Sequence, residues 1–238
     1  GKSVVLFSTL GPDDPSIAKT KAALQALGID AGEVGRHLGK QQGLILRELL
    51  DRGEISRCAV LCPPHLVDQW QRELWDRFHV RAVALTASTV NRIEKEIPHG
   101  VSILDHYSFA VVSLDYIKSE SHRSNFLAIA PECIIVDEAH TCTLAGPGRQ
   151  LRFELLSKLA ENTARHMVLL TATPHSGNDV AFNHLLSLLK PAFAGLLDGS
   201  AEAVRPLRED LARHFVQRRR KDIEEWQDES VFHQPMTA

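Results

Sequence analysis

The sequence predicts an α/β fold with a mainly parallel, doubly wound sheet and helices on both faces. Short apolar runs of the length of buried strands recur along the chain, and Cys133–Val136 is the clearest of them. Segments with helical spacing of leucines, such as residues 43–52, separate these runs, and this alternation is typical of parallel sheets. Polar residues follow several runs directly, at the carboxyl ends of strands where α/β proteins place their chemistry.

Composition limits the class of protein. With 238 residues and 44% apolar content, the chain can bury a core as one large domain or two small ones. A formal charge of -3 excludes a generally basic nucleic-acid coat, so phosphate binding has to come from local patches. The four cysteines lack metal-ligand spacing, and no apolar run approaches the roughly eighteen residues of a membrane span. We therefore expect reduced thiols, a cytoplasmic location and no membrane partner.

The elements of the first half follow from apolar patterning. Expected are strands at residues 3–8, 58–62 and 80–85, and helices at 16–27, 43–52 and 66–74. Two prolines end the second of these strands. Trp70 lies among apolar residues at helical spacing, and this favours a core position over stacking on a base.

The second half continues the alternation. Expected are a strand-to-helix step at residues 110–118, strands at 133–136 and 167–170, and helices at 151–159, 182–189 and 204–215. Directly after the central strand stands Asp137-Glu138-Ala139-His140. Two acids in this place can simply cap the next helix. Alternatively, Asp137 holds a hydrated magnesium ion and Glu138 polarises an attacking water.

A second motif makes the interpretation of the acid pair more specific. About thirty residues later, Leu170-Thr171-Ala172-Thr173-Pro174 ends another apolar strand. Together the two motifs resemble motifs II and III of superfamily-two helicases. The continuation Pro174-His175-Ser176-Gly177-Asn178 is similar to the Swi/Snf-type group, especially its bacterial branch of RNA-polymerase-associated and phage-defence ATPases. The resemblance runs from about residue 31 to 226 and implies a RecA-like (P-loop NTPase) lobe.

The resemblance also implies roles at the two motifs. Asp137, Glu138 and His140 would be catalytic, with Asp137 on Mg²⁺ and ATP as the nucleotide. Residues Thr171, Ala172, Thr173 and His175 would couple hydrolysis to movement.

The stretch at residues 31–46 stands where the family carries its nucleotide loop, but it departs from the pattern Ala-Asp-Glu-x-Gly-x-Gly-Lys-Thr. With a two-residue insertion, Gly35, Gly39 and Lys40 supply the phosphate contacts, and Gln41 replaces the hydroxyl residue. Aligned without a gap, His37 and Leu38 fall on the glycine and lysine positions. In either alignment we expect weakened ATP binding.

Contacts to nucleic acid are implied at three further places. The segment with Pro63 and His65 resembles motif Ia, and Ser113 lies in a segment similar to motif Ib. Ser113 can instead cap the following helix. The basic run Arg218, Arg219, Arg220 and Lys221 resembles the cationic segment near the end of the first lobe, although a solvated helix face is the commoner meaning of such a run.

We expect three parts: residues 1–30 outside the resemblance, 31–226 as the ATP-binding lobe, and 227–238 as a tail. Because the chain begins at Gly1 and not at methionine, we expect a fragment. The resemblance implies a second RecA-like lobe, and we expect it to be missing from this chain because little sequence follows Lys221. The predicted function is the N-terminal lobe of an ATP-dependent translocase or helicase on double-stranded DNA, with RNA polymerase or a defence complex as the implied partner. One alternative is a non-catalytic nucleic-acid- or protein-binding module with a degenerate nucleotide loop. Another is that residues 1–30 are an unrelated element joined to a helicase fragment.

Overall fold

The computed structural model describes residues 4–9, 38–143, 147–171, 179–196 and 201–218. These residues form a seven-stranded sheet in the order β3-β4-β2-β5-β6-β1-β7, and all the described strand pairs are parallel. The strands are β1 (Val4–Thr9), β2 (Cys58–Cys62), β3 (Val83–Leu85), β4 (Phe109–Ser113), β5 (Cys133–Val136), β6 (His166–Thr171) and β7 (Phe215–Arg218). The predicted parallel α/β sheet is therefore confirmed.

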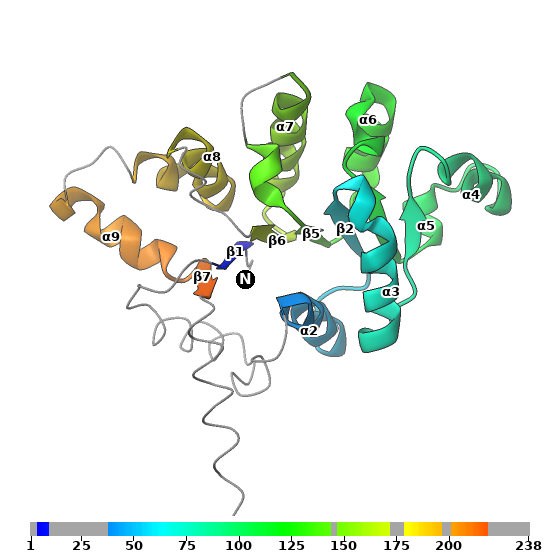
Figure 1. Cartoon of the computed structure of the whole chain (residues 1–238), viewed down its shortest axis with the longest axis horizontal. Helices are drawn as coiled ribbons and strands as arrows, with labels where there is room; N and C mark the ends of the chain where they lie inside the picture. Colours follow the sequence, from blue (N-terminus) through cyan, green and yellow to red (C-terminus); the bar gives the residue numbers. More distant parts are fainter. Residues whose placement is uncertain (1–3, 10–37, 144–146, 172–178, 197–200, 219–238) are drawn as a thin grey trace, which may run out of the picture.

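Helices cover both faces of this sheet (Figure 1). One face packs against α2 (Leu38–Asp51) and α3 (Val67–Phe78), and the other packs against α6 (Glu120–Ile129), α7 (Pro147–Glu161), α8 (Asp179–Leu189) and α9 (Ala201–Leu211). The short helices α4 (Val90–Glu96) and α5 (Ile103–His106) lie beside the β3 edge. Short 3-10 turns are η2 (Pro64–Leu66), η3 (Tyr116–Lys118), η4 (Ala139–Cys142) and η5 (Pro191–Gly195).

The core divides along the strands because successive side chains point to opposite faces. In β5, Ile134 and Val136 join the cluster under α6, α7 and α8, whereas Cys133 and Ile135 join the cluster under α2 and α3. All four of these side chains are fully buried. This burial on both faces explains why β5 is a continuous apolar run with no polar alternation.

Strand β1 lies between β6 and β7 in the same sheet. Val4 pairs with Met167 and Leu6 pairs with Phe215, so this N-terminal segment is hydrogen-bonded on both sides. The expected strand at residues 3–8 is confirmed within one residue at each end, while the expected helix at 16–27 falls outside the described residues. The domain boundary at residue 30 stays a prediction.

The end of the described chain differs from the expectation of one helix over residues 204–215. Helix α9 ends at Leu211, and Phe215–Arg218 forms β7, which pairs with β1 at the edge of the sheet. Helical spacing in the sequence does not reveal the available strand edge, which here overrides local preference. Arg218 consequently lies on a strand and not on a helix face.

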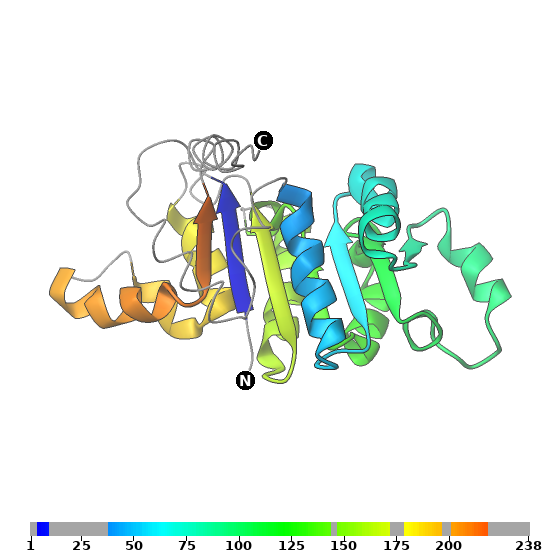
Figure 2. The same cartoon turned by 90° about the horizontal axis from the view of Figure 1, so that it is seen from below.

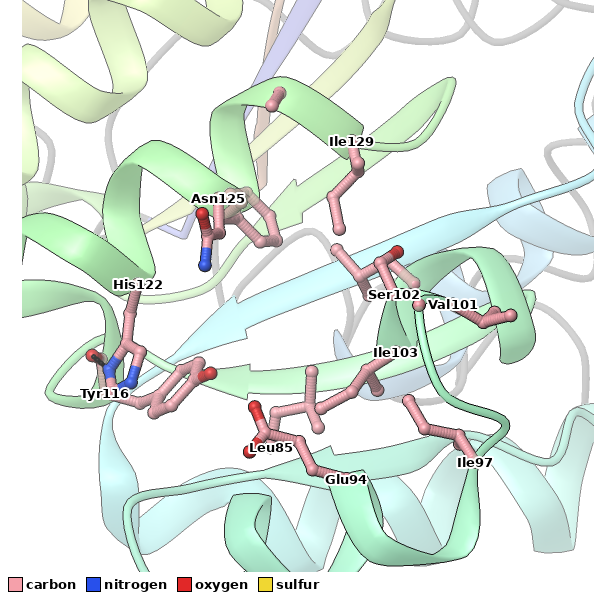
Figure 3. Close-up of a pocket in the computed structure, with 14 residues that line it drawn as sticks. Leu85, Glu94, Ile97, Val101, Ser102, Ile103, Tyr116, His122, Asn125 and Ile129 are labelled. Atoms are coloured by element: carbon pink, nitrogen blue, oxygen red, sulfur yellow. Dashed lines mark hydrogen bonds between the residues drawn. The ribbon is translucent and has the colours of Figure 1, made fainter.

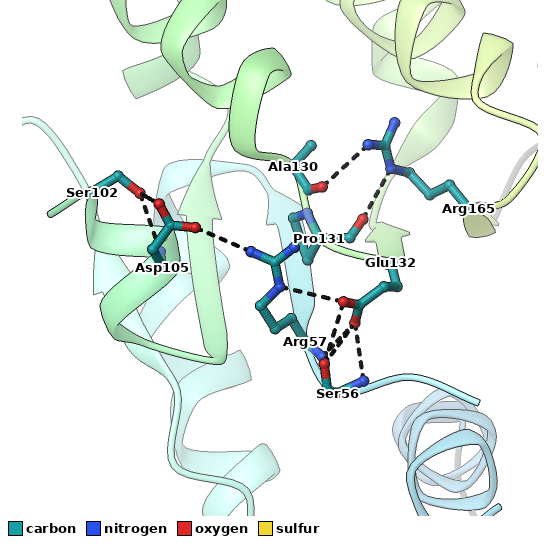
Figure 4. Close-up of polar contacts among 8 residues, drawn as sticks. All are labelled: Ser56, Arg57, Ser102, Asp105, Ala130, Pro131, Glu132 and Arg165. Carbon is teal, nitrogen blue, oxygen red and sulfur yellow. Dashed lines mark hydrogen bonds and ion pairs between the residues drawn. The ribbon is translucent and has the colours of Figure 1, made fainter. Parts of the chain in front are cut away.

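A polar network links the segments that precede three of the strands (Figure 4). The Glu132 carboxylate accepts hydrogen bonds from the backbone N–H groups of Ser56 (3.0 Å) and Arg57 (2.7 Å), and the Arg57 guanidinium also contacts Asp105 at 3.3 Å. Because all these strands are parallel, this network lies at the amino edge of the sheet, opposite the edge at which Asp137 emerges. Among the described helices, none is long and apolar enough to cross a bilayer.

Candidate functional site

The acid pair lies at the carboxyl edge of the two central strands. Asp137 follows β5 directly, and its backbone N–H donates to the Leu61 carbonyl of β2 at 2.8 Å. This bond extends the β2–β5 ladder and fixes the Asp137 backbone. Glu138 then adopts the left-handed conformation (φ 50°, ψ 44°), which costs of order 1 kcal/mol for a residue with a Cβ and turns the chain sharply into η4.

Both oxygens of the Asp137 carboxylate already accept one hydrogen bond. Oδ1 accepts from the Glu138 backbone N–H at 2.9 Å, and Oδ2 accepts from the Trp70 indole Nε1 at 2.7 Å. A carboxylate oxygen has two lone pairs, so each oxygen keeps capacity for a further donor or a cation. Trp70 is 8% exposed, and this confirms the predicted core position.

Glu138, His140 and Thr171 form a second cluster beside Asp137. His140 Nδ1 is hydrogen-bonded to Thr171 Oγ1 at 3.1 Å, which joins the Asp-Glu-Ala-His turn to the end of β6. Glu138 Oε2 lies 3.1 Å from the same nitrogen but makes no hydrogen bond, and this oxygen is buried. A buried carboxylate oxygen without a hydrogen-bond donor costs about 1–3 kcal/mol.

The far end of the turn is held by α8. Thr143 Oγ1 donates to the His140 carbonyl at 3.1 Å, and His184 Nδ1 donates to the Thr143 carbonyl at 3.2 Å. The His184 ring also stacks on Phe153 of α7, with centroids 4.7 Å apart. The turn that carries the acids is thus anchored to β6 and, through Thr143, to two helices.

The carboxylates suit a magnesium ion. The described residues contain no group of three or more His, Cys, Asp and Glu side chains that could form an all-protein cage. Mg²⁺ does not require one, because it prefers hard oxygen ligands and combines one or two carboxylates with water and phosphate oxygens. Asp137 and the buried Glu138 oxygen beside His140 provide such ligands within one turn.

The expected nucleotide loop is only partly described. Gly35 lies outside the described residues, whereas Gly39 and Lys40 form part of the first turn of α2. Helix α2 precedes β2 through a short connection and runs antiparallel to it, so its N-terminus lies toward the edge at which the strands end (Figure 2). Backbone N–H groups in a first helical turn lack helical partners and can bind phosphate.

The residues expected to contact nucleic acid are distributed along the same edge. Pro63 and the exposed His65 follow β2, and Ser113 ends β4, which pairs with β2. Ser113 is only 2% exposed, and its hydroxyl accepts from the Asp115 backbone N–H at 3.2 Å, whereas the following turn η3 has Asp115 as its N-cap and no side-chain capping hydrogen bond. Arg218 ends β7. The remaining expected site residues lie outside the described part of the chain: Ala172, Thr173, His175, Arg219 and Arg220.

A cavity of about 380 Å³ lies elsewhere, between α4, α5 and α6 at the β3 edge (Figure 3). Its wall is largely apolar, with polar groups on Glu94, Tyr116, His122 and Asn125. Burial, and to a smaller degree the charge of Glu94, raises the pKa of the Tyr116 hydroxyl. None of the expected site residues lines this cavity, so it is separate from the acid pair.

Comparison with known proteins identifies the family. The SNF2-related domain matches residues 12–225. The chain belongs to the SNF2-related family. This result confirms the Swi/Snf-type resemblance carried by the two motifs.

Relatives of this SNF2-related chain include the uncharacterized ATP-dependent helicase YqhH of Bacillus subtilis. The two are 29% identical over 196 residues, which cover 82% of this chain and 32% of the relative. The RNA polymerase-associated protein RapA of Actinobacillus pleuropneumoniae is 30% identical over 166 residues, which cover 66% of this chain and 17% of RapA. The chain thus spans about a third or less of the curated relatives described here.

Solved structures support the fold of the SNF2-related lobe. The Sulfolobus solfataricus SWI2/SNF2 ATPase core in complex with dsDNA matches with a TM-score of 0.57 and 14% identity, over 89% of this chain and 46% of that one. A second structure, of the Sulfolobus solfataricus SWI2/SNF2 ATPase core domain, matches with a TM-score of 0.54 and 15% identity. At this identity the likeness concerns the fold, and it confirms the RecA-like architecture.

Proposed function

We propose that this chain is the N-terminal ATP-binding lobe of an ATP-dependent DNA translocase or helicase, which couples ATP hydrolysis to movement on nucleic acid. The observation that carries the proposal is the acid pair at the carboxyl edge of the central strands, with a buried Glu138 oxygen that makes no hydrogen bond. Membership of the SNF2-related family supports the same reaction class.

Each expected residue has a role in this proposal. Asp137 holds Mg²⁺, and Glu138 accepts a proton from the attacking water. Mg²⁺, when bound, neutralises charge on the phosphate oxygens. His140 orients the acid turn through its hydrogen bond to Thr171. Phosphates are held by the first turn of α2 with Gly35, Gly39 and Lys40, and coupling involves Thr171, Ala172, Thr173 and His175.

The proposed partners follow from the family and its relatives. Double-stranded DNA is the proposed nucleic acid, bound by Pro63, His65, Ser113 and the run from Arg218 to Arg220. A second RecA-like lobe is proposed to complete the ATP site, and RNA polymerase or a defence complex is the proposed assembly in the cytoplasm. A DNA-bound core among the similar structures and RapA among the relatives support these proposals.

Nucleotide binding tests the proposal directly. Titration with a fluorescent ATP analogue and Mg²⁺ should give saturable binding that Asp137→Ala removes. The matched control Asp76→Asn changes an exposed carboxylate on α3 and should leave binding unchanged. No saturable binding up to millimolar nucleotide would exclude the enzyme function for this chain.

The second candidate is a non-catalytic binding module, which the altered loop at residues 36–42 favours. If Lys40 contacts phosphate, Lys40→Ala should weaken nucleotide binding at least about tenfold. If the ungapped alignment is correct, Lys40→Ala has little effect, and Leu38→Lys with Gly39→Thr should strengthen binding. If the chain binds DNA but neither it nor any of these variants binds nucleotide, the non-catalytic binding module is the correct function.

A further inference from the structure

Trp70 of α3 contacts the Asp137 carboxylate, although it lies 67 positions earlier in the sequence. Trp70 Nε1 donates to Asp137 Oδ2 at 2.7 Å. Among the hydrogen bonds of the described residues, the other donor to this carboxylate is the backbone N–H of the adjacent Glu138. Trp70 is therefore the group from a separate element that sets the direction of the carboxylate.

Trp70 is held too firmly to follow the carboxylate. It is 8% exposed and belongs to the core cluster under α2 and α3, together with Val67, Leu74 and Phe78 of its own helix. Rotation of the indole would open this packed cluster, and dense cores resist such changes. The N–H group consequently points in one direction whatever the state of the Asp137 side chain.

The surroundings of Asp137 on the core side are poorly solvated. Asp137 is half-buried, and the neighbouring thiol of Cys62 is fully buried. A hydrogen bond to an ionised oxygen in such surroundings is strong and directional. It occupies one lone pair of Oδ2 and leaves the remaining lone pairs of both oxygens for a cation.

We propose that Trp70 is a positioning residue that orients the Asp137 carboxylate for the magnesium ion through its indole N–H. The inference rests on the proposed role of Asp137. Hydrogen-bond partners of metal ligands commonly change metal affinity by about 10- to 100-fold when they are removed. Loss of the Trp70 N–H should therefore raise the magnesium requirement of nucleotide binding.

The test compares Trp70→Phe, which keeps an aromatic ring and removes the N–H, with Trp75→Phe, which changes an exposed tryptophan on the same helix. Binding of the fluorescent ATP analogue is measured across a magnesium series and in EDTA. In Trp70→Phe the magnesium concentration at half-maximal binding should rise about tenfold, with binding in EDTA unchanged. Trp75→Phe should match the unmodified chain. Equal magnesium requirements in both variants would overturn the inference.

A second measurement decides the case if Trp70→Phe does not fold. In a protein with Trp75→Phe and Trp226→Phe, Trp70 is the remaining tryptophan. Its fluorescence should shift when Asp137→Asn is added and when Mg²⁺ and nucleotide bind. Emission that responds to neither change would refute a positioning role. Absence of magnesium-dependent binding in the unmodified chain would instead remove the proposed function, and the inference with it.

Discussion

Arg165 is a buried cation that, among the described residues, is hydrogen-bonded to backbone carbonyls and not to a carboxylate. Its Nε donates to the Pro131 carbonyl at 2.9 Å, its Nη1 to Leu159 at 3.0 Å and its Nη2 to Ala130 at 3.2 Å. These carbonyls lie near the ends of α6 and α7, so a single side chain joins both helices to the amino edge of the sheet (Figure 4).

We expect Arg165→Met to lower the free energy of unfolding by about 2–4 kcal/mol, because three carbonyl groups in a buried region lose their donors. Urea denaturation measures this difference. The control Arg205→Met removes an arginine whose side chain is 80% exposed, and it should change stability by no more than about 0.5 kcal/mol. A loss below about 1 kcal/mol for Arg165→Met would contradict a structural role for the guanidinium.

Glu132 makes the stability of the fold depend on pH. Partial burial alone would raise the pKa of Glu132, but the hydrogen bonds from Ser56 and Arg57 outweigh it and hold the pKa below its ordinary value of 4.5. A carboxyl whose pKa is lower in the folded state stabilises the fold above its unfolded pKa. This contribution is lost as the pH falls below about 4.5 and through the folded pKa.

Glu132→Gln should therefore destabilise the protein at pH 7 and flatten the fall in stability between about pH 5 and pH 3. Denaturant unfolding at several pH values tests both effects. Glu161→Gln, at the exposed end of α7, serves as the control and should keep the original pH dependence. A pH profile for Glu132→Gln parallel to the unmodified chain would show that Glu132 is not the responsible group.

At the scale of elements, the adjacent strands β2 and β5 bury three of the four thiols. Cys58 pairs in register with Cys133, and a hydrogen bond between the two thiols, together with burial, raises the pKa of Cys58. Burial also raises the pKa of Cys142, in η4, to about 11. Because thiolates are the reactive form, these cysteines are protected both by burial and by their protonation.

We expect a thiol reagent at pH 8 to label the native chain at least about a hundredfold more slowly than the chain in denaturant. The variant Lys158→Cys places a thiol on an exposed position of α7 and should add one rapidly labelled group. Rapid labelling of the unmodified native chain would mean that the central strands open readily.

At the scale of the whole molecule, the proposed nucleic-acid binding has to overcome a formal charge of -3. The basic run begins at the last residue of the edge strand β7 and concentrates four positive charges: Arg218, Arg219, Arg220 and Lys221. Each phosphate contact contributes roughly 0.9 to the slope of log affinity against log salt on duplex DNA. The run is thus the sequence feature best able to supply salt-dependent affinity.

Replacing these four residues by glutamine should flatten the salt slope by about 2–4 units if they contact phosphates. Fluorescence anisotropy with a duplex oligonucleotide over a salt series measures the slope. The matched control replaces four arginines that each pair with an acid four positions away in the sequence: Arg47, Arg52, Arg92 and Arg205. Equal salt slopes in the two quadruple variants would indicate that the basic run is exposed to solvent and contacts no phosphates.

The local sequence was sufficient to predict the central strands, the acid pair and the family. Continuous apolar runs such as Cys133–Val136 are informative because both faces of a central parallel strand are buried. The spacing of the Asp-Glu-Ala-His and Leu-Thr-Ala-Thr-Pro motifs reflects two neighbouring strands that end at one edge. The edge strand β7 was not predicted, because its structure depends on a partner strand far away in the sequence.

Tertiary structure alone decided which groups surround the acids. Helical spacing predicted that Trp70 is buried, but its hydrogen bond to Asp137 requires α3 and β5 to pack together. The same holds for His184, whose contact with Thr143 joins α8 to the acid turn and has no local signal. The apolar pattern of the sequence predicts which side chains avoid water, because hydrophobicity is a property of each residue. Directional hydrogen bonds across 40 to 70 positions depend on the orientation of packed elements, and only the folded chain determines that orientation.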